Sequence, residues 1–434
     1  MAVPEGATAE SRQPKRALAV VVGIVFVDLL GFGVVIPILP YYVRSFAVSD
    51  AVIGLLAASY SLMQFLAAPT LGRLSDERGR RPVILLSLLG GGIAWTVFGV
   101  AGEVGAVGGT ALGVAVLFLS RMLAGAMGGN IAAANAYIAD VTAPERRAGA
   151  LGLLGASFSL GFIFGPALGG LAASGPVVAA ADAALPEFVP TTQYSLPSFL
   201  AAGLSLSAMM LAFRYLEEPN RRRGSVERKS MLDTFREALA DPKLRGLVIA
   251  FFLASVAFSG VQVMFIPFAA DIYGYGTTEV ALFLTYIGVL GALNQGVLVG
   301  RLSRVVAPSR LAVAGAALLA AALGMLPFSP ELGRALLPWV SVVSPELAWL
   351  LVSGAVLSLG NGLLNVSLST LVSTGASADR QGSAFGVTQG AGSLGRTVGP
   401  PLMGVLYVAT YWSPFIVGAL VILPVLGLLA QRAR

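Results

Sequence analysis

Long apolar runs separated by short polar segments dominate this chain and constrain its fold more than any other feature. We predict twelve of them, nearly all of about 20 residues or more, the length at which an α-helix crosses the hydrocarbon core of a bilayer. Their residues do not alternate between polar and apolar, as the strands of a membrane barrel do. The runs therefore predict an all-α membrane protein with twelve transmembrane helices.

The composition supports a membrane protein and excludes several kinds of chemistry. Of the 434 residues, 56% are hydrophobic and only 12% are charged, against about 25% charged in a soluble domain. The chain has no cysteine and no histidine, which excludes disulfides and imidazole catalysis and removes the usual zinc ligands. We therefore expect no metal site, no cofactor, no nucleic-acid partner and no enzymatic activity.

The predicted spans fall into two groups of six on either side of a charged linker. They cover residues 17–41, 50–72, 82–102, 111–138, 148–174, 196–215, 245–271, 279–300, 310–328, 346–373, 382–408 and 412–431. The predicted domains are a cytoplasmic tail (1–16), a first bundle (17–215), a cytoplasmic linker (216–244) and a second bundle (245–434). Within the linker, the segment SMLDTFREAL is expected to be partly helical.

The positions of Lys and Arg predict the orientation, because these residues accumulate on the cytoplasmic side of a membrane. With both termini inside, the outer loops hold only Arg44 and Arg334, and only Arg121 and Arg396 fall in the interior of spans, away from their ends. The opposite orientation would place nearly all basic residues outside. The abundance of Ala, Gly and Arg is typical of GC-rich bacterial genomes. We therefore expect a multi-pass protein of a bacterial inner (plasma) membrane, with both termini in the cytoplasm.

Three short segments of the first half return in the second half at similar offsets. GRLS at 72 recurs 228 residues later, ERRAGALG at 145 aligns with DRQGSAFG at 379, and GFIFGPALGG at 161 aligns with GRTVGPPLMG at 395. The repeats predict two pseudo-symmetric six-helix bundles that arose by parallel duplication. Transporters with such repeats bind their substrate between the halves, near the middle of the membrane.

Four segments of the first half resemble signatures of the major facilitator superfamily. GRLSDERGRRPV (72–83) resembles its loop between helices 2 and 3, and DLLGFGVVIPILP (28–40) resembles the first-helix motif of its twelve-helix drug:proton antiporter branch. RMLAGAMGG (121–129) is similar to the fourth-helix motif of that branch, and GFIFGPALGG (161–170) to its antiporter motif in helix 5. With the further segments YSLMQFLAAPTLG and NAYIADVT, the first half most resembles tetracycline-type efflux proteins.

The resemblance implies the major facilitator fold and transport by alternating access, and the chain departs from the family pattern at a few positions. The loop aspartate is followed by Glu77 and Arg78, where the family usually has a basic residue and then an apolar or aromatic one. Ala124 stands where the fourth-helix motif often has glutamine, and the functional histidine of tetracycline exporters is missing.

Asp28 is the only acidic residue in the interior of a predicted span, because the acidic residues at span ends lie on the outer side, and this makes it a candidate proton carrier. A carboxylate in the membrane costs several kcal/mol, roughly 2.5–3.5 on the lenient insertion scale, and such groups usually have a function. A structural role, pairing with a neighbouring helix, is the alternative. Arginine does not release its proton, so neither Arg121 nor Arg396 is the carrier. Each can stabilise a nearby carboxylate or bind an anionic group of the substrate, or it can be structural, in an ion pair or in hydrogen bonds to the carbonyls of broken helices. The resemblance implies a role in proton coupling for Arg121.

The loop and the fifth helix supply the predicted conformational elements. Asp76 can bond Arg80, and Gly79 permits a tight turn, so the loop could latch one access state, as the resemblance implies. The latch candidates are Gly72, Asp76, Gly79, Arg80 and Arg81. Small residues spaced along helix 5 allow close helix packing, and a proline bends it. These residues are Gly161, Gly165, Pro166, Gly169 and Gly170.

Amide side chains within the spans are candidates for the wall of a substrate cavity, although many will only bond to other helices. The candidate cavity residues are these amides and one arginine: Gln64, Asn130, Asn135, Gln262, Asn294, Asn365, Gln389 and Arg396. No GxxxxGK[ST] phosphate-binding loop is present, so we expect a proton gradient to supply the energy.

The sequence is best explained as a proton-coupled exporter of amphiphilic small molecules or drugs. The expected partners are the lipid bilayer, a small-molecule substrate and protons, and the expected state is a monomer. Two alternatives remain open. One is a proton symporter or facilitator that imports a nutrient, and the other is a receptor or lipid-handling membrane protein that does not transport.

Overall fold

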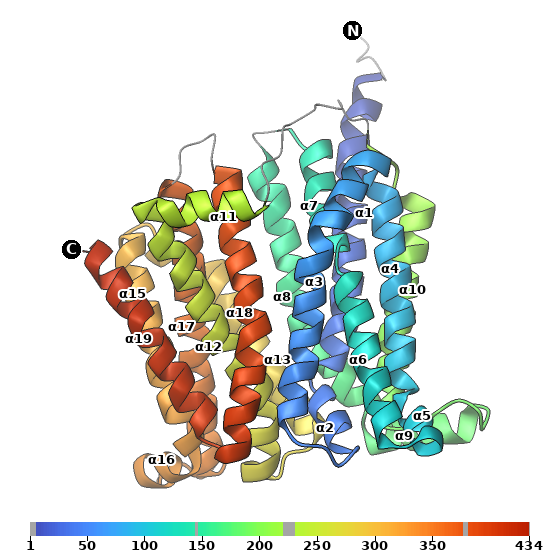
Figure 1. Ribbon diagram of the computed structural model, residues 1–434, viewed down its shortest axis with the longest axis vertical. Helices are drawn as coiled ribbons and strands as arrows, with labels where there is room; N and C mark the ends of the chain where they lie inside the picture. Colours follow the sequence, from blue (N-terminus) through green and yellow to red (C-terminus); the bar gives the residue numbers. More distant parts are fainter. Residues whose placement is uncertain (1–5, 144–145, 220–230, 376–380, 434) are drawn as a thin grey trace. The chain divides into compact units, whose positions relative to one another are not determined.

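The computed structural model describes residues 6–143, 146–219, 231–375 and 381–433, and within these ranges it contains helices and no strand (Figure 1). The first residues of the predicted tail (1–5) and a large part of the predicted linker (220–230), with its basic run RRRGSVERK, lie outside the described residues. The segment of the linker expected to be helical is α11 (Met231–Ala240).

Eleven spans among the described residues are long and apolar enough to cross a membrane. A twelfth helix, α18 (Gln381–Ala409), has 29 residues, and at 1.5 Å per residue about 44 Å of helix exceeds the roughly 30 Å hydrocarbon core. Its glutamine, serine, threonine and arginine side chains make it more polar than the others. With α18, the structure contains the twelve spanning segments that the apolar runs predict.

The chain forms two compact units, and the first comprises Met1–Phe46, Leu62–Ser225 and Gly276–Thr285. Its helices are α1 (Gly6–Val35), α2 (Leu39–Arg44), the later turns of α3 (Ala51–Arg78), α4 (Arg80–Gly99), α5 (Ala101–Gly108), α6 (Thr110–Ala126), α7 (Asn130–Val141), α8 (Arg147–Ala172), α9 (Gly175–Ala184), α10 (Ser195–Tyr215) and the start of α13 (Thr277–Leu293). Apolar side chains of α1, α4, α7, α8 and α10 form its core. The short helices α5 and α9 lie at the end of this unit opposite the N-terminus (Figure 1).

The second unit comprises Ala47–Ser61, Val226–Tyr275 and Tyr286–Arg434. Its helices are the first turns of α3, α11, α12 (Pro242–Tyr273), the remainder of α13, a π-helical turn η2 (Asn294–Leu298), α14 (Val299–Leu302), α15 (Pro308–Met325), a 3-10 turn η3 (Leu326–Phe328), α16 (Ser329–Leu336), α17 (Pro345–Gly375), α18 and α19 (Ser413–Ala433). Helix α11 lies across the ends of this unit's long helices near the C-terminus, and α16 lies at the other end (Figure 1). Phe235 and Ala238 attach α11 to Val248, Val387 and Ala391.

Two predicted spans are interrupted in the structure. The span 17–41 ends as α1 at Val35 and resumes as α2 at Leu39, because Pro37 and Pro40 have no N–H to continue the hydrogen-bond ladder. The span 111–138 divides into α6 and α7 around Met127–Gly129, where two glycines weaken the helix. The side chain of Leu71 fills the space beside Gly129, with its Cβ 2.9 Å from the position of a Cβ there.

Each unit contains a pair of helices whose backbones touch at glycines of the repeated segments, and these two pairs are equivalent in the repeat. In the first unit α1 packs on α8, where a Cβ on Gly33 would lie 2.7 Å from the carbonyl oxygen of Gly161. In the second unit α12 packs on α18, where a Cβ on Gly260 would lie 2.8 Å from the carbonyl oxygen of Gly399. The aligned segments GFIFGPALGG and GRTVGPPLMG therefore serve the same packing role in the two units.

Candidate functional site

The carboxylate of Asp28 joins three helices of the first unit. Asn130 of α7 donates from Nδ2 to one carboxylate oxygen at 2.6 Å, and Ser205 of α10 donates from Oγ to the other at 3.0 Å. Both donors are neutral, and Asp28 forms no ion pair with any cation of the described residues. The group is therefore held in place by hydrogen bonds that do not depend on a fixed positive charge.

The break between α6 and α7 explains why Asn130 reaches Asp28. Asn130 is the first residue of α7, and its Oδ1 accepts a hydrogen bond from the N–H of Ile131 at 2.9 Å. This bond orients the amide so that Nδ2 points to Asp28. Asn130, one of the residues predicted for a substrate cavity, is 4% exposed and is a hydrogen-bond partner of Asp28. Sequence spacing did not show this, because it depends on where the helix breaks.

Arg121 of α6 is 5% exposed and lies against aromatic rings of two neighbouring helices. Its guanidinium carbon is 5.2 Å from the ring centre of Trp95 and 5.9 Å from that of Phe32. Phe32 also meets Trp95 and Phe162 edge to face, with centroids 6.4 and 6.3 Å apart. The quadrupoles of the rings attract a buried cation, and sequence reasoning did not identify Trp95 as a partner of Arg121.

The glycines of the antiporter-like segment place α8 directly on α1, next to Asp28. A Cβ on Gly165 would lie 2.6 Å from the Cα of Gly33, and a Cβ on Gly161 would lie 2.8 Å from the Cβ of Leu29. Gly169 faces the backbone of Val34 in the same way.

The remaining two residues of this segment have different neighbours. Gly170 faces α13, where its Cβ would lie 2.6 Å from that of Ala281. Pro166 lies inside α8, and its Cδ is 3.4 Å from the position of a Cβ on Gly33. The segment is thus a close-packing surface against α1 and α13 within the first unit.

The charged loop is much shorter in the structure than the sequence predicts. Helix α3 continues to Arg78 and α4 begins at Arg80, so Gly79 alone makes the turn, with a φ of 121° that favours glycine. Gly72 lies two turns earlier in α3, and a Cβ there would meet nothing within 4 Å. Packing therefore does not require a glycine at position 72.

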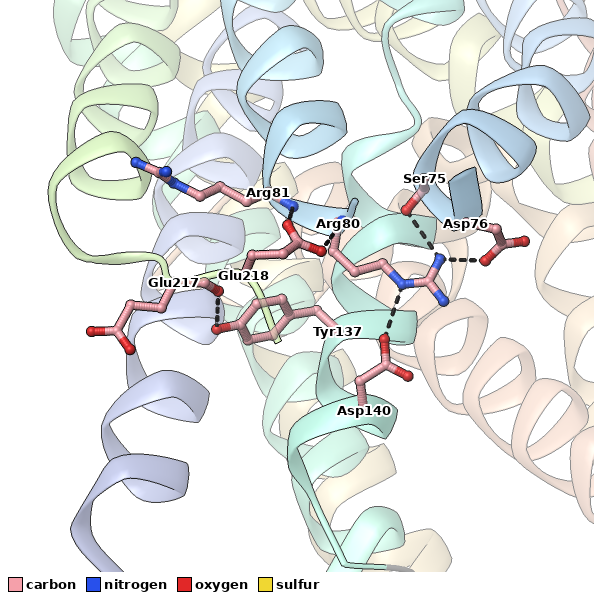
Figure 2. Close-up of polar contacts among 8 residues, drawn as sticks. All are labelled: Ser75, Asp76, Arg80, Arg81, Tyr137, Asp140, Glu217 and Glu218. Atoms are coloured by element: carbon pink, nitrogen blue, oxygen red, sulfur yellow. Dashed lines mark hydrogen bonds and ion pairs between the residues drawn. The ribbon is translucent and has the colours of Figure 1, made fainter. Parts of the chain in front are cut away.

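Arg80 is the centre of a polar network at this turn, shown in Figure 2. Its Nη1 lies 2.6 Å from a carboxylate oxygen of Asp76 and 3.1 Å from Oγ of Ser75, while its Nε lies 3.0 Å from Asp140 at the end of α7. The predicted pair of Asp76 and Arg80 is therefore present. Asp140, which the prediction did not include, ties α7 to the same guanidinium.

Glu218 is a second residue of the network that the sequence prediction did not include. Its two carboxylate oxygens accept the backbone N–H groups of Arg80 and Arg81 at 2.7 and 2.8 Å (Figure 2). These are two of the N–H groups that a helix N-terminus leaves without an intrahelical partner. A Cβ on Gly79 would lie 2.8 Å from this carboxylate, so the glycine also makes room for Glu218.

Two further bonds attach the end of α10 and the residues that follow it to α7 and α4. The hydroxyl of Tyr137 donates to the carbonyl oxygen of Glu217 at 2.9 Å, and Nη2 of Arg81 donates to the carbonyl oxygen of Phe213 at 2.8 Å. The guanidinium of Arg81 also lies over the ring of Phe213, 5.6 Å from its centre. The segment that leads into the linker is therefore fixed to α4 and α7.

We expect Glu218→Ala to destabilise the first unit and Glu217→Ala to leave it unchanged. The first substitution removes two hydrogen bonds to a helix N-terminus, where loss of a capping side chain costs about 1 kcal/mol. The second is a matched control, because Tyr137 bonds the backbone of Glu217 and not its side chain. Thermal unfolding of the purified variants in one detergent measures both effects. Equal unfolding midpoints for the two variants would contradict a capping role.

The second copy of GRLS has no corresponding network. Gly300–Ser303 spans the end of α14 and the turn after it, and Arg301, Arg304 and Arg310 around it are exposed. None of these three arginines forms an ion pair with a described residue. In the part of the chain that the structure describes, the network at this turn is therefore confined to the first unit.

The other predicted cavity residues differ in exposure. In the first unit Gln64 is partly buried, and Asn135 is exposed and bonds the carbonyl oxygen of Ile131 on its own helix at 3.0 Å. In the second unit Asn294 is partly buried beside Ser358, at 3.4 Å. The other three amides of the second unit that were predicted to line a cavity are exposed, although they lie within spanning helices. They are Gln262, Asn365 and Gln389.

Comparisons with known proteins agree with this architecture. The family model of the Major Facilitator Superfamily matches residues 21–344. The tetracycline resistance protein, class C, of Escherichia coli is 30% identical over 95% of this chain and 96% of its own length. Multidrug resistance protein 1 of Bacillus subtilis is 27% identical over 92% of this chain and 91% of its own length.

A solved structure shows the same fold. A bacterial homologue of the iron transporter ferroportin, in an inward-facing state, superimposes with a TM-score of 0.71 at 14% identity, covering 96% of this chain and 98% of that one. The family match extends over most of the chain, and the twelve-helix architecture agrees with it. This protein is therefore a membrane transporter that belongs to the major facilitator superfamily.

Proposed function

We propose that this transporter exports amphiphilic small molecules, including drugs, in exchange for protons. The relatives named for tetracycline and multidrug resistance match it over at least nine-tenths of its length, which supports export of such compounds. The scarcity of basic residues in the outer loops, which hold only Arg44 and Arg334, supports an inner-membrane protein with both termini in the cytoplasm.

The environment of Asp28 is the observation that carries proton coupling. A carboxylate locked in an ion pair would lose that pair on protonation, but among the described residues Asp28 is bonded only to the neutral side chains of Asn130 and Ser205. A serine hydroxyl can donate or accept, so the contact at this oxygen can persist in both protonation states. Asp28 is also the only acidic residue in the interior of the predicted spans, away from their ends, where ionisable groups usually serve transport.

In the proposed cycle Asp28 is deprotonated when the substrate binds from the cytoplasm and is protonated from the outside after release. The close contact of α1 with α8 transmits the change. Because the backbones touch at Gly33 and Gly165, a shift of α1 near Asp28 cannot be absorbed by side-chain rearrangement and must move α8. The network around Arg80 holds the cytoplasmic ends of α3, α4 and α7 in one arrangement during part of the cycle.

Purified protein in liposomes with an imposed proton gradient tests the proposal. Candidate substrates come from a growth-inhibition screen of drugs, tetracycline among them, in an efflux-deficient host that expresses the chain. We expect the substrate to move against the direction of proton flow and to reverse direction when the gradient is reversed. Movement in the same direction as the protons would identify a symporter, and flux insensitive to the gradient would identify a facilitator.

A further inference from the structure

Arg396 is a membrane-embedded cation that the proposed proton pathway does not use. It lies near the middle of α18 and is partly buried. Its Nη2 donates to Oγ of Ser393 at 2.8 Å, and the guanidinium forms no ion pair with any carboxylate of the described residues. Charged groups at this depth usually pair with another group or face a water-filled cavity, because an isolated charge is costly there.

The fold itself does not require a cation at this position. In the repeat Arg396 aligns with Phe162 of α8, and the helix pair α1–α8 packs as closely as α12–α18 without it. Position 396 follows Gly395, where a Cβ would lie 2.6 Å from the carbonyl oxygen of Phe252 on α12. The close α12–α18 contact at Gly395 therefore fixes the position of the α18 backbone next to Arg396.

Polar residues continue along the same face of α18. Gln389, Ser393 and Arg396 are spaced i, i+4 and i+7, so they share one face of the helix. Gln389 is exposed and has no hydrogen-bond partner among the described residues. Gly392 leaves space beside this polar stripe of Gln389, Ser393 and Arg396. A Cβ on Gly392 would lie 3.6 Å from Nη1 of Arg396 and 3.3 Å from Oγ of Ser255.

We propose that Gln389, Ser393 and Arg396 form a subsite for an acidic oxygen group of the transported molecule, such as a carboxylate, sulfonate or enolate. The assignment rests on the proposed export of amphiphiles, and it further specifies that the exported molecule carries a negatively charged group. A guanidinium has five N–H donors in a planar fork that matches such groups, and Ser393 occupies only one of its nitrogens. The exposed amide of Gln389 supplies a further donor.

The charges within the spans oppose a subsite for lipophilic cations. Three charged residues lie in the interior of the predicted spans, away from the span ends, and two of them are arginines and one is an aspartate. The aspartate, Asp28, already has a hydrogen-bond partner on each oxygen. Arg121 lies on the rings of Phe32 and Trp95, whereas Arg396 has a hydrogen bond to Ser393 and an electrostatic interaction with the phenol of Tyr60 but no carboxylate partner among the described residues.

The absence of native cysteine allows a direct test with thiol reagents of opposite charge. In the purified Ser393→Cys variant, we compare the modification rates of anionic sulfonatoethyl methanethiosulfonate and cationic trimethylammonioethyl methanethiosulfonate, each relative to a free thiol. A guanidinium in contact range should favour the anionic reagent by about tenfold. Adding Arg396→Gln should abolish the preference, while Arg396→Lys should retain most of it.

The equivalent residue of the repeat supplies a matched control. Ser159 of α8 aligns with Ser393, and Phe162 stands there in place of Arg396, so Ser159→Cys should show no anion preference. No reaction of Ser393→Cys with either reagent would mean that water does not reach the stripe. A preference that survives Arg396→Gln would mean that Arg396 does not create it. Either result overturns the subsite.

Protection by a ligand tests binding itself. The probes are the aromatic sulfonate 8-anilinonaphthalene-1-sulfonate and, as the cation, tetraphenylphosphonium. We expect the sulfonate to slow modification of Ser393→Cys at least threefold and to leave Ser159→Cys unaffected, and the cation to slow neither. Equal protection by both probes, or none by the sulfonate, overturns the anion subsite. Neither experiment uses a proton gradient, so failure of proton antiport would leave both results interpretable.

Discussion

Replacing Asp28 with Asn is expected to lower proton-driven export by at least about 100-fold while the protein still folds and inserts. Asn has nearly the shape of Asp, and its amide can accept from Asn130 and donate to the hydroxyl of Ser205. The substitution therefore preserves both helix contacts but removes the proton that the side chain carries. Uptake into everted vesicles energised by a proton gradient measures the loss.

Exchange of labelled for unlabelled substrate separates proton coupling from structure. Exchange moves no net proton, so Asp28→Asn should retain it at a rate close to that of the unmodified protein. Ser205→Ala is the matched control, because it removes one hydrogen bond from Asp28 and leaves the carboxyl group in place. We expect it to keep proton-driven export within about threefold, a loss that corresponds to less than 1 kcal/mol. Normal pumping by Asp28→Asn would show that another residue carries the proton.

Replacing Gly165 with Val is expected to prevent the first unit from reaching its native packing. The added Cβ would lie 2.6 Å from the Cα of Gly33, and two further methyl groups would have to fit into a backbone contact. Overpacking of this kind costs typically about 1–3 kcal/mol and more where backbone must move. Expression as a monodisperse species in detergent, followed by thermal unfolding, measures the effect.

Gly152→Val on the same helix is the control for helix propensity. A Cβ on Gly152 would meet nothing within 4 Å, so this substitution changes propensity and leaves the contact with α1 intact. We expect it to be folded and to unfold within a few degrees of the unmodified protein, since propensity alone is worth less than about 1 kcal/mol. Similar losses at positions 152 and 165 would refute the close α1–α8 contact as the cause.

The fold was predictable because the bilayer imposes a strong constraint on sequence. Each span must satisfy its backbone internally and present apolar side chains over about 20 residues, so length and hydropathy located the spans. The repeat offsets identified the two halves, and the family match confirms the superfamily that the loop and helix motifs predict. The glycines at positions 161 and 165 were likewise predictable as packing residues, because only close approach explains small residues at this spacing.

The partners of the polar residues were not predictable. Asp28 is bonded to residues 102 and 177 positions away, and Glu218 caps a helix that begins 138 positions before it. No local pattern encodes such distances. Asn130 illustrates the limit, because its side chain reaches Asp28 only where the α6–α7 break puts it at the first turn of a new helix.

The sequence alone thus determined the number of spans, the duplication, the superfamily and the list of membrane-embedded charges, since each follows from residue types along the chain. The tertiary structure decided which of those charges are compensated. It placed Asp28 between two neutral donors, Arg121 on aromatic rings, and Arg396 beside the hydroxyl of Ser393 and in electrostatic range of Tyr60. The physical reason is that the cost of a charge in a membrane depends on the few atoms around it, and packing brings those atoms from distant parts of the chain.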